Sequence, residues 1–176
     1  MGELITRPAT TADIPAIAAI YDEQVINGTA TFEVVSPDET EMARRMAEIA
    51  AAGYPYFVAE RNSRVLGYSH GGPYRPRPAY RNTVEDSVYL ATDARGQGIG
   101  GALLRLVIDE CTVRGFRQMI AVIGDATNAA SVRLHKAAGF TLVGTLKDVG
   151  YKHGRWIDSV LMQRALGIGA SGKPDR

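Results

Sequence analysis

The sequence contains little cysteine, tryptophan or histidine, and its charges nearly balance. Its single cysteine, Cys111, excludes an intrachain disulfide and favours a reducing compartment. A formal net charge of +1 argues against the basic surface of a general nucleic-acid-binding protein. No window reaches the roughly 20 apolar residues of a membrane-spanning helix, and charged residues near the start replace the apolar core of a signal peptide. These absences favour a small-molecule ligand, with neither nucleic acid nor a membrane as partner, and a cytoplasmic location.

The histidines and the chain length set two further bounds. His70, His135 and His153 lack the spacing of metal ligands, and no cysteine or paired-carboxylate cluster joins them, so no metal site is expected. A chain of 176 residues with 45% hydrophobic content fits one domain with its own core. No repeat or charge block divides it. We therefore expect a single domain over residues 1–166 and a loose polar tail over residues 167–176.

Hydrophobic periodicity and turn residues predict an α/β sheet of mixed strand direction. The predicted strands cover residues 4–7, 56–60, 65–70, 87–91, 118–124, 142–146 and 156–162. The first helix has Asp13 as its cap, and the second has Ser36 as N-cap, Pro37 at its first position and Glu39 completing a capping box. A third helix extends to Gly115, and a fourth is capped by Asn and ends before Gly-Phe. The resulting order is β α α β β β α β α β β.

The stretch RGQGIGG, residues 95–101, follows a predicted apolar strand and precedes a helix. A chain that turns into a helix without Cβ atoms exposes backbone N–H groups, and an anion such as a phosphate binds well there. The glycines could alternatively form only a tight turn. Gly96, Gly98 and Gly101 also fit the dinucleotide-binding pattern, but they follow a hairpin past mid-chain rather than opening a βαβ unit. No Lys-Ser or Lys-Thr follows them, which disfavours a nucleoside triphosphate loop.

Two motifs together resemble the GCN5-related N-acetyltransferase (GNAT) superfamily. VYLATDARGQGIGGALL, residues 88–104, is similar to the family's acetyl-CoA motif, whose pattern is filled by Arg95, Gly98 and Gly100. NAASVRLHKAAGF, residues 128–140, is similar to the second landmark, an Asn before a helix that ends in Gly-Phe. The resemblance covers nearly the whole chain and implies the GNAT fold, a mixed central β-sheet with a splayed strand pair, flanked by helices on both faces. It also implies acetyl-CoA as co-substrate.

The segments TVEDSVY and GYKHGRWIDSVLMQ resemble the branch of phosphinothricin, methionine sulfoximine and methionine sulfone acetyltransferases. This resemblance implies an enzyme that transfers acetyl from acetyl-CoA to the α-amino group of a small amino acid analogue, by direct attack in a ternary complex. It also implies a homodimer. The alternatives are the same fold acting on another amine, such as a polyamine, an antibiotic or a protein N-terminus, and a non-catalytic acyl-CoA-binding module.

The resemblance gives proton transfer to two residues. Glu85, at the start of the strand before the glycines, matches the general base of the branch; the alternative is a solvated carboxylate. His135 stands where many relatives carry a Tyr that reprotonates the thiolate, and an imidazole with an ordinary pKa of about 6.5 suits that role or a proton relay. The alternative is a histidine that only packs on its helix. Asp86 alternates to the opposite strand face, so it is a weaker candidate base and is expected to contact the substrate.

The remaining contacts are expected from positions that match the family's motifs. The expected acetyl-CoA contacts are Val88, Tyr89, Leu90, Arg95, Gly96, Gln97, Gly98, Ile99, Gly100, Gly101 and Asn128. The expected substrate contacts are Arg75, Pro76, Arg77, Glu85, Asp86 and Ser87. Arginine forks suit a carboxylate or phosphinate, although these arginines and Arg81 could equally form a solvated loop. Lys152, His153 and Arg155 are further candidates for holding an anionic group or the opposite subunit.

Overall fold

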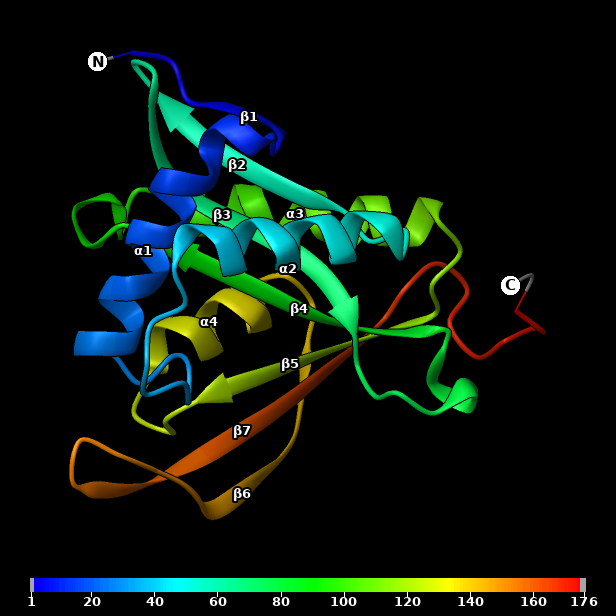
Figure 1. Ribbon diagram of the computed structural model, residues 1–176. Helices are drawn as coiled ribbons and strands as arrows, with labels where there is room; N and C mark the ends of the chain where they lie inside the picture. Colours follow the sequence, from blue (N-terminus) through cyan, green and yellow to red (C-terminus); the bar gives the residue numbers. More distant parts are fainter. Residues whose placement is uncertain (1, 175–176) are drawn as a thin grey trace.

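Seven strands form one mixed sheet in the order β1-β2-β3-β4-β5-β7-β6 (Figure 1). The structure is a computed structural model that describes residues 2–174. Its strands are β1 (Ile5–Pro8), β2 (Tyr56–Arg61), β3 (Arg64–Pro73), β4 (Thr83–Leu90), β5 (Gln118–Gly124), β6 (Thr141–Lys152) and β7 (Arg155–Ala165). Neighbouring strands are antiparallel, except that β4 and β5 run parallel. Met1 and the last two residues of the predicted tail lie outside the described residues.

Helices cover both faces of the sheet. They are α1 (Ile14–Asn27), α2 (Glu39–Ala51), α3 (Ile99–Val113) and α4 (Ala129–Ala137). In Figure 1, α1 and α2 lie on one face, and α3 and α4 lie on the other. The predicted order of strands and helices, the β2–β3 hairpin and the α/β architecture are all confirmed. Within the described residues, none of the helices combines the length and apolar character needed to cross a membrane.

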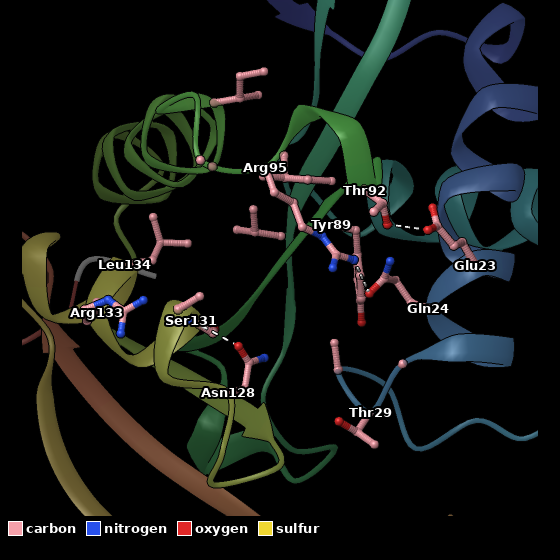
Figure 2. Close-up of a pocket in the computed structure, with 18 of the residues that line it drawn as sticks. Glu23, Gln24, Thr29, Tyr89, Thr92, Arg95, Asn128, Ser131, Arg133 and Leu134 are labelled. Atoms are coloured by element: carbon pink, nitrogen blue, oxygen red, sulfur yellow. Dashed lines mark hydrogen bonds between the residues drawn. The ribbon is translucent and has the colours of Figure 1, made fainter. Parts of the chain in front are cut away.

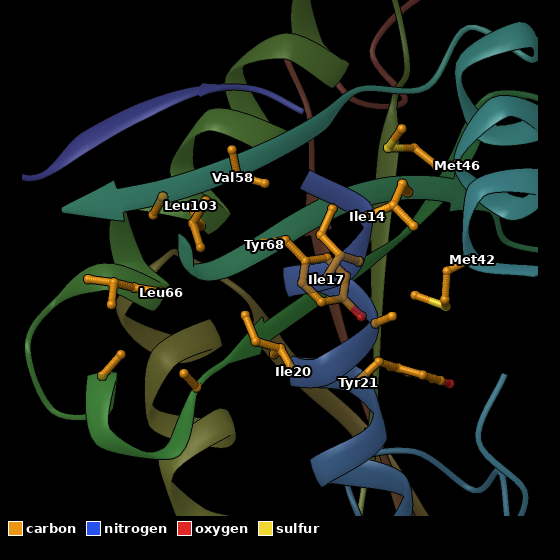
Figure 3. Close-up of a cluster of buried hydrophobic side chains, with 14 of the residues drawn as sticks. Ile14, Ile17, Ile20, Tyr21, Met42, Met46, Val58, Leu66, Tyr68 and Leu103 are labelled. Carbon is orange, nitrogen blue, oxygen red and sulfur yellow. The ribbon is translucent and has the colours of Figure 1, made fainter. Parts of the chain in front are cut away.

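Each face of the sheet buries an apolar core, because the helices direct apolar stripes toward it. On the α1–α2 face, Ile17, Val58 and Tyr68 are at most 1% exposed (Figure 3). Leu104 of α3 and Met119 of β5 are fully buried in the second core. Burying one side chain of this size contributes about 1.5–3 kcal/mol relative to leaving it in water. The close-packed sheet between these cores is a rigid support for groups at its edges.

The start of α2 differs from the prediction. The helix begins at Glu39, and its N-cap is Asp38, whose carboxylate accepts a hydrogen bond from the Glu41 N–H at 2.8 Å. Pro37 therefore precedes the cap, and Ser36 Oγ is buried without a partner. Serine and aspartate both cap helices, but the carboxylate gains more from the helix dipole. The prediction of Ser36 as N-cap and of a Ser36–Glu39 capping box is wrong.

Asp13 occupies the N-cap position of α1, as predicted, but its carboxylate does not cap that helix. Instead it accepts a hydrogen bond from the Thr10 N–H at 2.7 Å and two from the Arg7 guanidinium, each at 2.8 Å. These bonds lower the pKa of Asp13 to about 2, with the Arg7 bond as the largest cause, although burial opposes the change. The residue therefore ties β1 to the start of α1.

The predicted strand over residues 87–91 begins too late. β4 covers Thr83–Leu90 because Val84 already pairs on both sides, with β3 and with β5. β6 and β7 likewise extend beyond their predicted ranges at both ends, because exposed side chains weaken their hydrophobic alternation. Glu85 and Asp86 consequently lie inside a strand, which fixes their side chains on opposite faces.

β4 and β5 pair only at the start of each strand. Thr83, Val84 and Glu85 face residues 118–120, and beyond Glu85 the two strands separate. β4 keeps its pairing with β3 as far as Leu90, so on its other side it leaves backbone groups without a partner in β5. The expected splayed strand pair is confirmed.

The chain turns back against the domain after β7. Leu166 is 1% exposed, and its N–H donates to the Arg117 carbonyl at 3.0 Å. The Arg117 guanidinium in turn donates to the Lys173 carbonyl at 2.9 Å. The described part of the predicted tail therefore contacts the domain.

Candidate active site

A groove of about 940 Å³ lies between the end of α1, the end of β4 and the N-termini of α3 and α4 (Figure 2). All of the expected acetyl-CoA contacts except Gln97 line it. The Gln97 side chain instead donates to the Asp93 carbonyl at 2.9 Å and accepts a hydrogen bond from Arg61 at 2.8 Å. Segments far apart in the sequence thus meet around one elongated space.

The groove also contains residues that the motifs did not indicate. From α1 come Glu23 and Gln24, and from α4 come Ser131 and Leu134. The available signal was the polar run at residues 22–24, which interrupts the otherwise largely apolar sequence of α1 about one turn before its end. Arg95 reaches across the groove, and its guanidinium donates to Gln24 Oε1 at 3.2 Å (Figure 2).

The glycine loop leaves room for a ligand at the N-terminus of α3. Gly96 and Gly98 have φ values of 74° and 79°, which L side chains rarely adopt, and Gly98 is the N-cap residue. A Cβ at either position would meet nothing within 4 Å, so the space beside the backbone is open. The first N–H groups of α3 have no partner within the helix, and the helix dipole favours negative charge there. The loop therefore fits a phosphate group.

Asn128 serves as the N-cap of α4 and also lines the groove. Its Oδ1 accepts a hydrogen bond from the Ser131 N–H at 3.2 Å. The amide nitrogen faces the groove in Figure 2, where it can donate to a ligand. The two interpretations of Asn128, helix cap and cofactor contact, are therefore compatible.

A second cavity, about 270 Å³, lies where β4 leaves β5. It brings Glu85, Asp86, Ser87 and His135 together. Val88, Tyr89 and Ser131 line both this cavity and the groove. The splay of the sheet thus joins the candidate proton-transfer residues to the end of the groove.

Glu85 is half-buried near the start of the splay. Burial raises the pKa of Glu85 to about 7, the charge of Asp86 adds to the rise, and Arg75 partly offsets it. A carboxylate with such a pKa exchanges protons readily at neutral pH. The chemistry of the residue suits a general base.

Asp86 and His135 form a buried pair. His135 Nε2 lies 2.9 Å from Asp86 Oδ2, and the side chains of His135 and Asp86 are 5% and 2% exposed respectively. His135 Nδ1 lies 2.8 Å from the Ser131 carbonyl, which only accepts, so Nδ1 carries a proton. Burial lowers the pKa of His135, but the hydrogen bond and charge of Asp86, aided by Ser131, outweigh it and the pKa is raised. Asp86 Oδ1 is buried without a partner.

A third cavity, about 430 Å³, lies between α2 and the sheet and has aromatic walls that the sequence did not indicate. The Tyr68 ring lies 5.3 Å from Tyr89 and 5.8 Å from Tyr56, and His70 stacks on Tyr56 at 4.9 Å. Burial lowers the pKa of His70, which favours a neutral ring. Tyr89 lines all three cavities, so one side chain borders each of them.

The expected substrate contacts at Arg75, Pro76 and Arg77 are exposed in the loop between β3 and β4. The Arg75 guanidinium lies over the Tyr74 ring, 5.1 Å from its centre, and close enough to Glu85 to affect its pKa. The structure brings Arg75 toward the cavities but leaves Arg77 on the surface. Among the described residues, no three His, Cys, Asp or Glu side chains gather in a way that could hold a metal ion.

Comparison with known proteins gives the family. Residues 6–161 match the model of the acetyltransferase (GNAT) domain. The phosphinothricin N-acetyltransferase of Alcaligenes faecalis is 55% identical over 163 residues, which cover 93% of this chain and 83% of the relative. The L-methionine sulfoximine/L-methionine sulfone acetyltransferase of Pseudomonas paraeruginosa is 40% identical over 161 residues, covering 91% and 93%.

A solved structure agrees with both relatives. The GNAT superfamily phosphinothricin acetyltransferase from Sinorhizobium meliloti, in complex with AcCoA, superposes with a TM-score of 0.95 at 49% identity, covering 98% of this chain and 94% of that one. The fold is thus that of acetyl-CoA-dependent N-acetyltransferases. The chain belongs to the GNAT family of N-acetyltransferases.

Proposed function

We propose that the chain transfers acetyl from acetyl-CoA to the α-amino group of a small amino acid analogue such as phosphinothricin, methionine sulfoximine or methionine sulfone, by direct attack in a ternary complex. The observation that carries this proposal is the meeting of Glu85 and the groove at the splay of β4. A base lies there beside free backbone donors, which is what acyl transfer to an ammonium requires. The names of the relatives support this acceptor class.

The groove supplies the contacts for acetyl-CoA, whose thioester provides the acetyl group. N–H groups at the start of α3, between Gly96 and Gly101, bind its pyrophosphate, and Arg95 adds positive charge. N–H groups of Val88 and Leu90 on the unpaired side of β4 donate to the arm and to the thioester carbonyl oxygen, whereas the Tyr89 N–H points toward β3, as the Ala91 N–H does, because N–H groups alternate along a strand. These donors stabilise the negative charge that develops on that oxygen.

Glu85 takes the proton from the substrate ammonium, directly or through water, because its raised pKa lets it accept and release protons near neutrality. His135 supplies the proton that the departing thiolate needs. Both of its ring nitrogens are already hydrogen-bonded, to Asp86 and to the Ser131 carbonyl. We therefore propose that the protonated His135 releases its hydrogen bond to Asp86 and gives the Nε2 proton to the departing thiolate, which leaves a neutral ring that keeps its proton on Nδ1.

The acceptor lies against Asp86, Ser87 and the aromatic cavity, with Arg75 near its acidic group. We propose a homodimer in the cytoplasm, with no role for nucleic acid or membranes. Several apolar side chains on β6 and β7 support self-association, since Val143, Tyr151 and Trp156 are 59–61% exposed.

The acceptor class is tested by steady-state kinetics. We expect acetyl-CoA consumption with phosphinothricin, methionine sulfoximine and methionine sulfone, with kcat/KM for at least one of them far above that for polyamines, aminoglycosides or N-terminal peptides. A higher kcat/KM for one of the latter amines would replace the acceptor. Absence of turnover with every amine, despite CoA binding, would indicate a non-catalytic acyl-CoA-binding module.

The glycine loop gives a second test. Gly98→Val places a β-branched side chain at a positive φ in the groove, and we expect CoA affinity to fall by about tenfold or more, because that backbone shape costs an L residue roughly 1–2 kcal/mol. Isothermal calorimetry with CoA measures it. Gly53→Val is the matched control, since Gly53 has φ of 81° and equally open space but lies after α2, away from the groove. Equal losses in both variants would contradict the assignment.

A further inference from the structure

We infer that Lys152 is a positioning residue that holds the segment Gly28–Phe32 (the 28–32 segment) in place as the shared wall of the acetyl-CoA groove and of the cavity that contains Glu85 and His135. The inference rests on the proposed function, because it concerns the same site. It gives the YKHGRW motif at the β6–β7 turn a role that neither the groove nor the proton transfer explains.

The 28–32 segment borders both cavities. Gly28, Thr29 and Ala30 line the groove, and Figure 2 shows Thr29 at its lower edge. Ala30, Thr31 and Phe32 line the cavity that contains Glu85 and His135. The segment follows α1 and has no regular secondary structure of its own. Its position must therefore be set by contacts from elsewhere.

Lys152, the last residue of β6, makes the most buried of these contacts. It is 4% exposed, and its Nζ donates to the Thr31 carbonyl at 2.9 Å and to the Gln24 carbonyl at 3.3 Å. Both partners are carbonyls, so the ammonium acts here as a hydrogen-bond donor in the last turn of α1 and at the far end of the segment. A cation at a helix C-terminus also interacts favourably with the helix dipole. Because the Lys152 side chain points inward, it is not available to contact a substrate or an opposite subunit.

Two neighbours of Lys152 hold the start of the segment. His153 Nε2 lies 3.1 Å from the Gly28 carbonyl, and as that oxygen only accepts, the ring donates. Arg155 donates to Asp125, and the same carboxylate accepts from Thr29 Oγ1 at 3.0 Å. Figure 1 shows the β6–β7 turn passing beneath the end of α1, where these contacts occur.

Two glycines allow the segment to seat closely. A Cβ at Gly124 would lie 2.2 Å from the Thr29 carbonyl oxygen, and a Cβ at Gly150 would lie 2.5 Å from the Phe32 ring. Neither residue has the positive φ that would by itself require glycine. The absence of a side chain at these places is therefore explained by the approach of the segment. Hydrogen bonds and close packing fix it independently of each other.

The test compares Lys152→Met with Lys147→Met. Met keeps the length of the side chain but cannot donate, and Lys147 is a matched control because it lies on the same strand with its side chain 72% exposed. We expect Lys152→Met to raise KM for acetyl-CoA and for the acceptor about tenfold or more, with a smaller effect on kcat, because displacing a binding wall by about 1 Å costs this much. Lys152→Arg, which keeps donors, should recover part of the loss.

A merely structural role predicts a different result, in which the midpoint of unfolding falls and KM of the remaining folded enzyme stays normal. Lys152→Met with a KM equal to that of Lys147→Met would overturn the inference. If Lys152→Met does not fold, Gly124→Ala decides, since its Cβ would push the Thr29 carbonyl away. Gly144→Ala is its control, because a Cβ there meets nothing within 4 Å. Unchanged KM in Gly124→Ala would equally contradict the inference.

Calorimetric titration with CoA separates this inference from the proposed function. Loss of CoA affinity in Lys152→Met but not in Lys147→Met supports the positioning role even if no amine is acetylated. Conversely, absence of turnover in the unmodified protein refutes the proposed reaction. The CoA affinities of Lys152→Met and Lys147→Met then still test the role of Lys152. Equal CoA affinity and equal KM in the two variants refute the positioning role alone.

Discussion

Replacing Glu85 by Gln is expected to lower kcat/KM by about 10² to 10⁴-fold, the usual contribution of a positioned general base. The substitution keeps the size and a hydrogen-bonding group but removes the basic oxygen. Because the groove is unchanged, KM for acetyl-CoA should stay within about threefold of its original value. Glu110→Gln is the matched control, since Glu110 is partly exposed on α3, pairs with Arg114 and lines none of the three cavities.

The pH profile makes this prediction specific. Glu85 acts as a base only when ionised, and its pKa is raised to about 7 by burial and by Asp86. The kcat/KM of the unmodified enzyme should therefore rise with pH up to about 7 and then level, whereas Glu85→Gln should lack that limb. A variant that keeps both the rate and the limb would show that another group takes the proton.

Replacing Asp86 by Ala is expected to destabilise the protein by about 3 kcal/mol near pH 6, because it leaves the buried His135 without its partner. Urea unfolding measures the change. The comparison is a double-mutant cycle with His135→Leu: once the imidazole is gone, Asp86→Ala should cost much less. Equal costs in the two backgrounds would mean that the two residues are not coupled.

The destabilisation by Asp86→Ala is expected to depend on pH, because the charge of His135 in the Asp86–His135 pair does. The pKa of His135 in the folded chain is raised above its ordinary value, so its stabilising contribution is complete below the unfolded pKa and is lost as pH rises through the folded pKa. The destabilisation by Asp86→Ala should thus be larger at pH 6 than at pH 9. A larger cost at pH 9 would contradict the assignment of a raised pKa.

Local signals in the sequence were enough for the order of elements and for the groove. Strand periodicity, the glycine loop and the Asn cap each act within a few residues, and the structure keeps all three. Glu85 and Asp86 were placed on opposite faces of one strand by alternation alone. The groove follows from this order, since it lies where β4, α3 and α4 meet.

Interactions between distant residues were beyond such reasoning. Asp86 and His135 are 49 residues apart, and Lys152 contacts a carbonyl 128 residues away. No local pattern indicates either contact, because each depends on how the sheet brings its strands and helices together. The prediction of where α2 starts was wrong for the opposite reason. Ser36 and Asp38 both satisfy the local rule for an N-cap, and only the folded chain selects one of them.

The opening in the sheet is bounded at two points. At its apex, three residue pairs join β4 to β5, and at its mouth Lys152 and His153 reach across to the end of α1. Because the opening is held at both of these points, it cannot widen unless one of the connections breaks. Its width is therefore set by the folded chain and does not depend on whether substrates are bound. We therefore expect the two substrates to meet in an aperture of constant size, with no closing lid before acetyl transfer.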